Sequence, residues 1–369
     1  MVKLDRGQEK IATLRKRLLA WYGLNRRDLP WRRTQDPYAI WVSEIMLQQT
    51  RVAAVVERYQ AFVARFPTLT ALARAPEQDV LALWSGLGYY RRARMLHKAA
   101  QVVVDQHKAK MPITSQALRL LPGIGPYTAA AIASIAHGEA VAVVDGNVER
   151  VLCRLSGWEA DSRTGAAALK REVNDLAAQL VDPAQPGDFN QAMMELGATV
   201  CLPRNPQCLV CPLALDCKTR GEHRTQPRPP MQSSEVAHAL ALRINKKPNH
   251  RHGKPTHEVL LEQRPASQSV MPGLWELPAL RDSAVPAEML LMTVRHSIMQ
   301  VNYSVRIRTV AEKDIDSLAV PGSERRWVAL SEAGGMALTG LARKVLTRAH
   351  LLPIAVGRKI APHPSSELL

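Results

Sequence analysis

The chain has 369 residues, enough for two domains with separate cores. Its hydrophobic share of 46% argues against a largely disordered protein, and its formal charge of +16 favours a polyanionic partner, nucleic acid before an acidic membrane surface. No apolar run approaches the roughly 20 residues that span a bilayer, and the start lacks the pattern of a signal peptide. We therefore expect no membrane contact and a cytoplasmic, nucleoid-associated location.

Residues 1–220 are expected to form an all-α domain. Apolar side chains recur there at the 3.6-residue period of a helix, for example at Ile11, Leu14, Leu18 and Trp21. Proline and glycine separate these periodic stretches into short helices. Alternation of the strand kind is scarce over the same region.

A second domain of mixed α/β type is expected over 236–352. It follows a polar, proline-rich linker at 221–235 and precedes a loose basic tail at 353–369. Segments such as HEVLLEQR and NYSVRIRTV alternate apolar and polar residues, as half-buried strands do. Helical patterns return at 286–292 and 340–349.

A helix-hairpin-helix is expected at about 114–137. Gly123 and Gly125 allow the backbone to approach a ligand closely, and Pro126 stands at the favoured first position of the second helix. The free N–H groups at the start of that helix can bind an anion such as a DNA phosphate. The alternative is a simple glycine turn between two helices.

Two carboxylates are candidates for catalysis. Asp145 precedes a periodic helix, so it can cap that helix and be held in the ionised form that stabilises an oxocarbenium ion. Glu44 is flanked by Trp41 and Ile45, so burial should raise its pKa and make it a general acid. The alternatives are a purely structural cap and a solvated glutamate.

Four of the five cysteines lie close together in the segment CLPRNPQCLVCPLALDC, at Cys201, Cys208, Cys211 and Cys217. Four thiolates can surround zinc or an iron–sulfur cluster, and two disulfides are a third possibility. Cys153 stands apart at an apolar helical position, where we expect a buried core residue.

Together these motifs resemble those of the endonuclease III superfamily of helix-hairpin-helix DNA glycosylases. The cysteine spacing is similar to that of its [4Fe–4S] loop, LPGIGPYTA to its DNA-binding hairpin and VDGNVER to its catalytic-aspartate segment. The segment SEIMLQQT, which contains Glu44, resembles the MutY-type adenine DNA glycosylases. Bifunctional relatives carry a nucleophilic lysine after the hairpin where this chain has Tyr127. The resemblance therefore implies a monofunctional enzyme with a [4Fe–4S] cluster.

The resemblance also implies a substrate and further site residues. The substrate would be duplex DNA with adenine opposite 8-oxoguanine or guanine, bound by a monomer. Tyr127 and Asn147 would position Asp145 and the sugar. The extruded adenine would be held by Trp31, Arg32, Leu47 and Gln191. Other DNA contacts would come from Gln49, Tyr89, Arg91, Gly123 and Gly125. For Trp31, ordinary core packing is the alternative.

The second domain contains LLEQRPASQSVMPGLWELP, which resembles the Nudix-like domain of MutY-type enzymes, a domain that helps recognise 8-oxoguanine. The following stretch lacks the glutamate cluster that would hold magnesium, so this domain should bind without hydrolysing. Ile298-Met299-Gln300 stands where the family usually has Phe-Ser-His. We expect His296, Ser297 or Gln300 to contact the lesion instead.

Two other functions are weighed against adenine removal. A bifunctional endonuclease III-like glycosylase and lyase acting on pyrimidine lesions is disfavoured by Tyr127 and by the second domain. A DNA-binding protein without catalysis is disfavoured by the coincidence of Glu44, Asp145, Tyr127 and Asn147.

Overall fold

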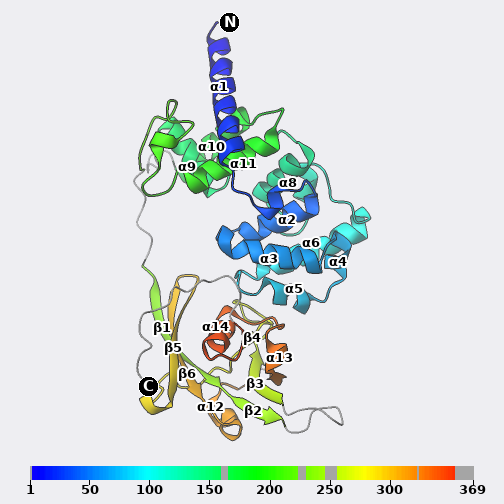
Figure 1. Ribbon diagram of the computed structural model, residues 1–369, viewed down its shortest axis with the longest axis vertical. Helices are drawn as coiled ribbons and strands as arrows, with labels where there is room; N and C mark the ends of the chain where they lie inside the picture. Colours follow the sequence, from blue (N-terminus) through cyan, green and yellow to red (C-terminus); the bar gives the residue numbers. More distant parts are fainter. Residues whose placement is uncertain (1, 159–164, 223–229, 246–255, 322–323, 354–369) are drawn as a thin grey trace. The chain divides into compact units, whose positions relative to one another are not determined.

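The structure is a computed structural model that describes residues 2–158, 165–222, 230–245, 256–321 and 324–353 (Figure 1). The basic tail after Pro353 and residues 223–229 of the expected linker lie outside these residues. The last part of the expected linker, from Gln232 onward, is a β-strand and not linker. The chain packs as two units. The first comprises 1–75 and 94–228, and the second comprises 76–93 and 229–369. Residues 76–93, which the sequence placed in the helical domain, thus pack with the second unit.

The first unit is helical, as expected. Its α-helices are α1 (Val2–Asn25), α2 (Pro37–Leu47), α3 (Val52–Arg65), α4 (Leu69–Arg74), most of α6 (Arg91–His107), α7 (Ser115–Leu118), α8 (Pro126–His137), α9 (Gly146–Ser156), α10 (Ala166–Leu180) and α11 (Pro186–Thr199). Two 3-10 turns, η1 (Pro30–Arg32) and η2 (Cys208–Val210), complete it. Over the described part of the chain, no helix has the length and apolar character that crossing a bilayer requires.

One core of this unit joins α1 to α9, α10 and α11. Leu14 and Leu18 of α1 are buried in it, together with Leu152 of α9 and Leu196 of α11. Cys153 is also buried there, which confirms the expectation of a core residue. This core fixes α9 and α11 side by side, and both helices carry residues of the pocket described below.

The second unit contains α5 (Glu77–Trp84) and the sheet-forming part of the chain. Its strands are β1 (Gln232–Leu240), β2 (Leu242–Asn245), β3 (Thr256–Gln263), β4 (Trp275–Glu276), β5 (Leu290–Ile298), β6 (Val301–Thr309) and β7 (Arg325–Ala329). Its further helices are η3 (Ala287–Met289), η4 (Glu312–Asp314), α12 (Ile315–Leu318), α13 (Leu330–Ala333) and α14 (Gly340–Arg348). The mixed α/β character expected for this region is confirmed.

Two sheets form in this unit. In one, β6 lies between β1, which runs parallel to it, and β5, which runs antiparallel. In the other, β3 pairs with β2 and β4 on one side and with β7 on the other.

The helical patterns expected in the second domain have different outcomes. The pattern at 340–349 is confirmed as α14, which Thr339 caps by accepting a hydrogen bond from the N–H of Ala342 at 3.1 Å. Of the helix expected at 286–292, only the 3-10 turn η3 forms, because β5 begins at Leu290 and pairs with β6. Pairing with a distant strand overrides a short local pattern that fits either structure.

Gly197 of α11 packs directly against Asn147 at the start of α9. A Cβ atom at this position would lie 2.7 Å from the Cβ of Asn147 and 3.1 Å from its carbonyl oxygen. The neighbouring backbone would have to move to accommodate a side chain. The close packing of α9 against α11 therefore depends on position 197 having no side chain.

We predict that Gly197→Ala lowers the free energy of unfolding by about 1–3 kcal/mol through overpacking. Gly23→Ala is the matched control, because its added methyl group meets no atom within 4 Å. That control should gain about 0.5–1 kcal/mol in helix stability. Urea denaturation of both variants measures the difference, and equal stabilities would contradict the packing described here.

Candidate active site

A cavity of about 950 Å³ opens among the helices of the first unit. It is lined by residues from η1, α2, the turn before α3, α8, the start of α9 and α11. The residues that the sequence placed in the catalytic and base-binding sets all line this pocket, together with Gln49: Trp31, Arg32, Glu44, Leu47, Gln49, Tyr127, Asp145, Asn147 and Gln191. Segments far apart in the sequence thus meet at one site.

Glu44 lies on α2 and its side chain is buried, with 5% of the residue exposed. Burial raises the pKa of Glu44 to about 7. A hydrogen bond from Tyr127 lowers this pKa, and the negative charge of Asp145 raises it by a smaller amount. A carboxyl group with this pKa is partly protonated at neutral pH and can act as a general acid.

Tyr127 is the second residue of α8, and α8 packs against α2. Its hydroxyl group donates a hydrogen bond to Oε2 of Glu44 at 2.8 Å. The sequence assigned Tyr127 to Asp145 and the sugar, whereas the carboxylate that its hydroxyl contacts is that of Glu44. The hydroxyl is therefore placed to orient the candidate acid.

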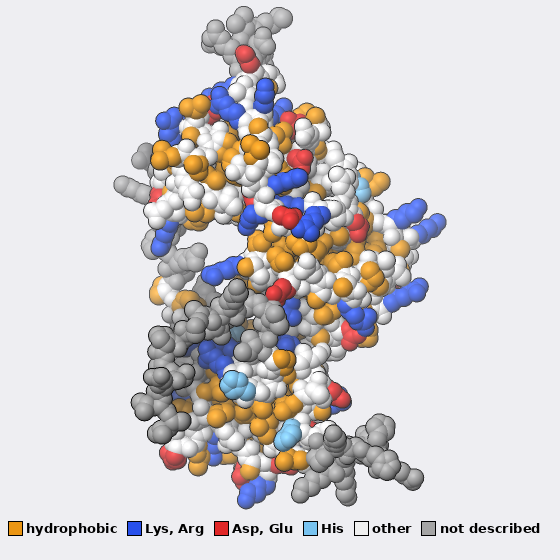
Figure 2. Space-filling model, viewed as in Figure 1, with side chains coloured by type: hydrophobic (Ala, Val, Ile, Leu, Met, Phe, Trp, Pro, Cys, Tyr) orange, Lys and Arg blue, Asp and Glu red, His pale blue; other side chains and the backbone are white. Residues whose placement is uncertain are grey.

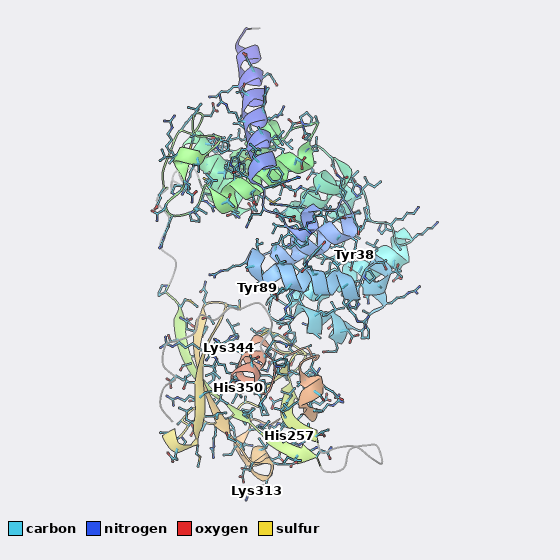
Figure 3. The ribbon with its side chains drawn as sticks, in the orientation of Figure 1. Tyr38, Tyr89, His257, Lys313, Lys344 and His350 are labelled. Atoms are coloured by element: carbon cyan, nitrogen blue, oxygen red, sulfur yellow. The ribbon has the colours of Figure 1, made fainter. Side chains whose placement is uncertain are left out.

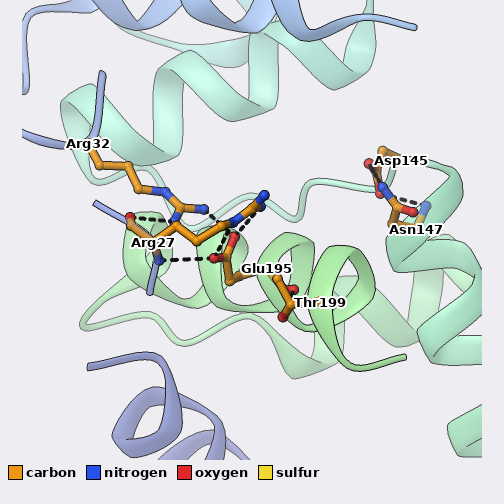
Figure 4. A network of polar contacts seen from close by, with 6 residues as sticks. All are labelled: Arg27, Arg32, Asp145, Asn147, Glu195 and Thr199. Carbon is orange, nitrogen blue, oxygen red and sulfur yellow. Dashed lines mark hydrogen bonds and ion pairs between the residues drawn. The ribbon is translucent and has the colours of Figure 1, made fainter. Parts of the chain in front are cut away.

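Asp145 is the N-cap of α9, as expected. Its Oδ1 accepts hydrogen bonds from the backbone N–H groups of Asn147 at 2.9 Å and Val148 at 2.7 Å. Its Oδ2 accepts one from Nδ2 of Asn147 at 3.1 Å (Figure 4). Three donors and the N-terminus of a helix thus hold this carboxylate in one orientation, where a negative charge is stabilised.

Arg150 connects this turn with the cysteine-containing loop. Its Nη2 donates hydrogen bonds to Oδ1 of Asn147 at 2.9 Å and to the carbonyl oxygen of Gly197 at 2.7 Å. Its Nε donates to the carbonyl oxygen of Cys201 at 2.9 Å. The position of Asn147, and with it that of Asp145, is therefore tied to the first cysteine of the loop.

A second buried glutamate in the pocket was missed by the sequence reasoning. Glu195 on α11 accepts hydrogen bonds from Nε and Nη2 of Arg27, both at 2.7 Å, and from Nη2 of Arg32 at 2.8 Å (Figure 4). Burial alone would raise the pKa of Glu195, but these hydrogen bonds outweigh it and lower the pKa to about 2. The sequence contained one signal that could have indicated Glu195 as a pocket residue: it lies one helical turn after Gln191, so both side chains are on the same face of the helix.

The sequence left two roles open for Trp31, core packing and lining of the base pocket, and its position combines them. It is buried and packs edge-on against Tyr59, with the ring centroids 5.3 Å apart. It also lines the pocket. Arg32 beside it is held by its ion pair with Glu195, so both residues present fixed groups to a ligand.

The four clustered cysteines line one small cavity of about 30 Å³, and the chain's five cysteines are all free of disulfides. Buried Arg154 ties their loop to α9 by donating hydrogen bonds to the carbonyl oxygens of Leu202 at 2.6 Å and Pro203 at 3.0 Å. Burial raises the pKa of Cys211 to about 11, and the neighbouring cysteines add to this. Within the described part of the chain, no three potential ligands converge as they would around a single metal ion.

The hairpin glycines do not line the pocket. Gly123 has φ +75°, and a Cβ atom there would lie 2.5 Å from the Cβ of Met95, so this turn requires glycine. Gly125 is the N-cap of α8. Tyr89 and Arg91 lie in the second unit.

The residues expected to read the lesion do not form one cluster. His296 lines a cavity of about 490 Å³ in the second unit, and so do Ile298 and Met299. Ser297 is exposed and donates a hydrogen bond to Oδ1 of Asn302 at 2.6 Å. Neighbouring residues of β5 face opposite sides of the sheet, which separates His296 from Ser297. Gln300 lies in the turn before β6 and does not line this cavity.

Comparison with known proteins identifies the first unit. A family model described as "HhH-GPD superfamily base excision DNA repair protein" matches residues 42–177. A solved structure of a thermostable thymine-DNA glycosylase is 30% identical, with a TM-score of 0.53, and the match covers 58% of this chain and 98% of that one.

Relatives named adenine DNA glycosylase extend the match. The human protein is 50% identical over 226 residues, which cover 59% of this chain and 41% of the relative. The mouse protein is 40% identical over 316 residues, which cover 73% of this chain and 61% of the relative. The chain thus matches about half the length of these relatives. It belongs to the HhH-GPD superfamily of base excision DNA repair proteins and, within it, to the MutY-type adenine DNA glycosylase family.

Proposed function

We propose that this protein hydrolyses the glycosidic bond of adenine mispaired with 8-oxoguanine or guanine in duplex DNA, without cleaving the strand. The observation that carries this proposal is the pairing of two carboxyl groups in one pocket. Glu44 has a pKa raised to about 7 by burial, while Asp145 is held by three N–H donors. Carboxyl groups in such different environments can divide acid and electrostatic roles between them.

The proposed reaction begins with extrusion of the adenine into the pocket, against Trp31, Arg32, Leu47 and Gln191. Glu44 then protonates a ring nitrogen, which makes the base a better leaving group. The bond to the sugar breaks, and Asp145 stabilises the oxocarbenium ion until water adds. Asn147 orients Asp145, and Tyr127 orients Glu44. Since tyrosine has no amine, it cannot form the imine that leads to strand cleavage.

DNA binding is supported by the charge of the chain. On the face drawn in Figure 2, Lys and Arg side chains are spread over both units among fewer acidic ones. We assign backbone contacts to Arg91 and to the hairpin around Gly123 and Gly125, which position the duplex without reading its sequence. The enzyme would act as a monomer in the compartment that holds the DNA.

We infer that the second unit is Nudix-like and contacts the base opposite the adenine. The cavity lined by His296, Ile298 and Met299 supports a contact from this edge of the sheet. Ser297 faces the other side and Gln300 lies in the turn, so His296 is the best placed of the three candidates.

The four cysteines suit a [4Fe–4S] cluster. All four cysteines line one cavity, and four cysteine thiolates are the usual ligands of such a cluster. A bound cluster would supply iron coordination that cross-links the loop. This chain's own residues, Arg150 and Arg154, carry that constraint to α9 and to the turn of Asp145.

The reaction itself is tested with duplexes that contain adenine opposite 8-oxoguanine, adenine opposite guanine, or thymine glycol, each with and without alkali. We predict strand breaks at adenine, and these appear only after alkali. Asp145→Asn should lower base release about 100-fold or more while DNA affinity stays unchanged. The fold should survive because asparagine caps helices as well as aspartate does. Cleavage at thymine glycol without alkali would support the bifunctional alternative instead.

The pH dependence tests Glu44. We predict that the single-turnover rate is level below pH 7 and falls about tenfold per pH unit above it, because Glu44 is protonated below its pKa of about 7. Tyr127→Phe should move the midpoint upward, since the Tyr127 hydrogen bond lowers this pKa. A rate that stays constant from about pH 6 to about pH 9, or full activity of Glu44→Gln, would refute the assignment.

Iron analysis tests the cluster without reference to activity. We predict about four irons per chain in protein purified without oxygen, with a charge-transfer absorption in the visible range. Cys208→Ala should lose most of this iron, whereas Cys153→Ala should keep it because Cys153 lies in the helical core. Bound zinc in place of iron would exclude a [4Fe–4S] cluster.

A further inference from the structure

Tyr89 is an exposed aromatic side chain in an unusual backbone conformation. It lies in the turn between α5 and α6 (Figure 3), and 56% of the residue is exposed to solvent. Its φ of 49° is in the left-handed region, which large side chains rarely adopt. Gly86 and Gly88, with φ of 97° and 71°, allow the sharp turn around it. A conformation of this kind persists only where the surroundings hold it.

Arg92 makes many of the contacts that stabilise this conformation of Tyr89. Its guanidinium group lies 5.5 Å from the ring centroid of Tyr89 and 5.4 Å from that of Trp84, so it contacts both rings. Its Nη2 also donates hydrogen bonds to the carbonyl oxygens of Leu87 at 3.2 Å and Gly88 at 3.1 Å. Arg92 thus holds both the turn and the ring of Tyr89 in place.

The turn is anchored by residues that lie far later in the sequence. The buried hydroxyl groups of Ser85 and Tyr90 both donate to the carbonyl oxygen of Leu338, at 3.2 and 3.0 Å. Nε of Arg343 in α14 donates to Oγ of Ser85 at 2.8 Å. These contacts explain why 76–93 pack with the second unit.

The resemblance already assigns Tyr89 to DNA; we propose that Arg92 is a positioning residue for it, which holds the Tyr89 ring rigidly in the orientation that stacks on a base, while Leu338 and Arg343 of the second unit anchor the turn. The proposal rests on the proposed function. A planar ring that is exposed and already ordered loses little conformational entropy when it stacks on a base. Arg92 acts through Tyr89 and needs no contact with DNA. The second unit thereby takes part in mispair recognition through a turn outside its sheets.

A double-mutant cycle tests the link between Arg92 and Tyr89. The Kd of the full chain is measured for a duplex with 2′-fluoroadenosine opposite 8-oxoguanine, which resists cleavage, and for a fully paired duplex. Tyr89→Asn should reduce the preference for the mispaired duplex about tenfold, as expected for one lost base–aromatic stack, and asparagine tolerates the left-handed backbone. Arg92→Met should cause a similar loss, and the double variant should be no worse than Tyr89→Asn alone.

Arg91→Met is the matched control, because it removes the same charge from the exposed neighbouring position. It should weaken binding of both duplexes equally, and its effect should add to that of Tyr89→Asn. Arg343→Met reaches the same turn through Ser85 and provides a second test if Arg92→Met does not fold. It should lower the preference for the mispair when Tyr89 is intact and have no further effect when combined with Tyr89→Asn.

The outcomes separate the two proposals. If adenine is released but the effects of Arg92→Met and Tyr89→Asn are additive, the positioning role of Arg92 is overturned and the proposed function stands. If Tyr89→Asn retains the full preference for the mispaired duplex, the stacking of Tyr89 on a base is overturned as well. If the unaltered protein neither releases adenine nor prefers the mispair, the proposed function itself fails.

Discussion

The removal of one carboxyl group from water is the constraint on which the site depends. Glu44 belongs to a stretch of α2 in which Trp41, Val42 and Met46 are fully buried, so its side chain has little contact with bulk solvent. Burial destabilises the charged form and raises the pKa into the range where a general acid is useful. Tyr127 opposes this shift and Asp145 assists it. The packing of α2 against α8 therefore sets the protonation state of the candidate acid.

The same pocket shows that burial alone does not decide protonation. Glu195 is as inaccessible as Glu44, yet its pKa is lowered to about 2 because Arg27 and Arg32 donate hydrogen bonds to it. That ion pair fixes Arg32 at the wall of the pocket, while Asp145 is fixed by the turn at the start of α9. The three carboxyl groups thus differ in their partners, and in the proposed reaction these differences let Glu44 donate a proton while Asp145 stabilises a cation.

The sequence predicted those parts of the site that local patterns encode. Asp145 was predicted because an N-cap is a local feature, and the buried Glu44 because its neighbours are apolar. The Glu195–Arg27 pair was missed because its partners are 168 positions apart. The helix expected at 286–292 is limited to the 3-10 turn η3 because the residues from Leu290 onward pair with β6, and strand pairing is a long-range interaction. The assignment of 76–93 to the second unit likewise depends on contacts with Leu338 that no local pattern reveals.

The central claim is that Glu44 is a partly protonated acid before substrate binds. The most direct measurement is a ¹³C NMR titration of protein labelled at the glutamate carboxyl carbon, with the signal of Glu44 assigned by comparison with Glu44→Gln. We predict a midpoint about pH 7 for this signal and a higher midpoint in Tyr127→Phe, where the opposing hydrogen bond is absent. A midpoint near 4.5, the ordinary value for glutamate, would contradict the claim.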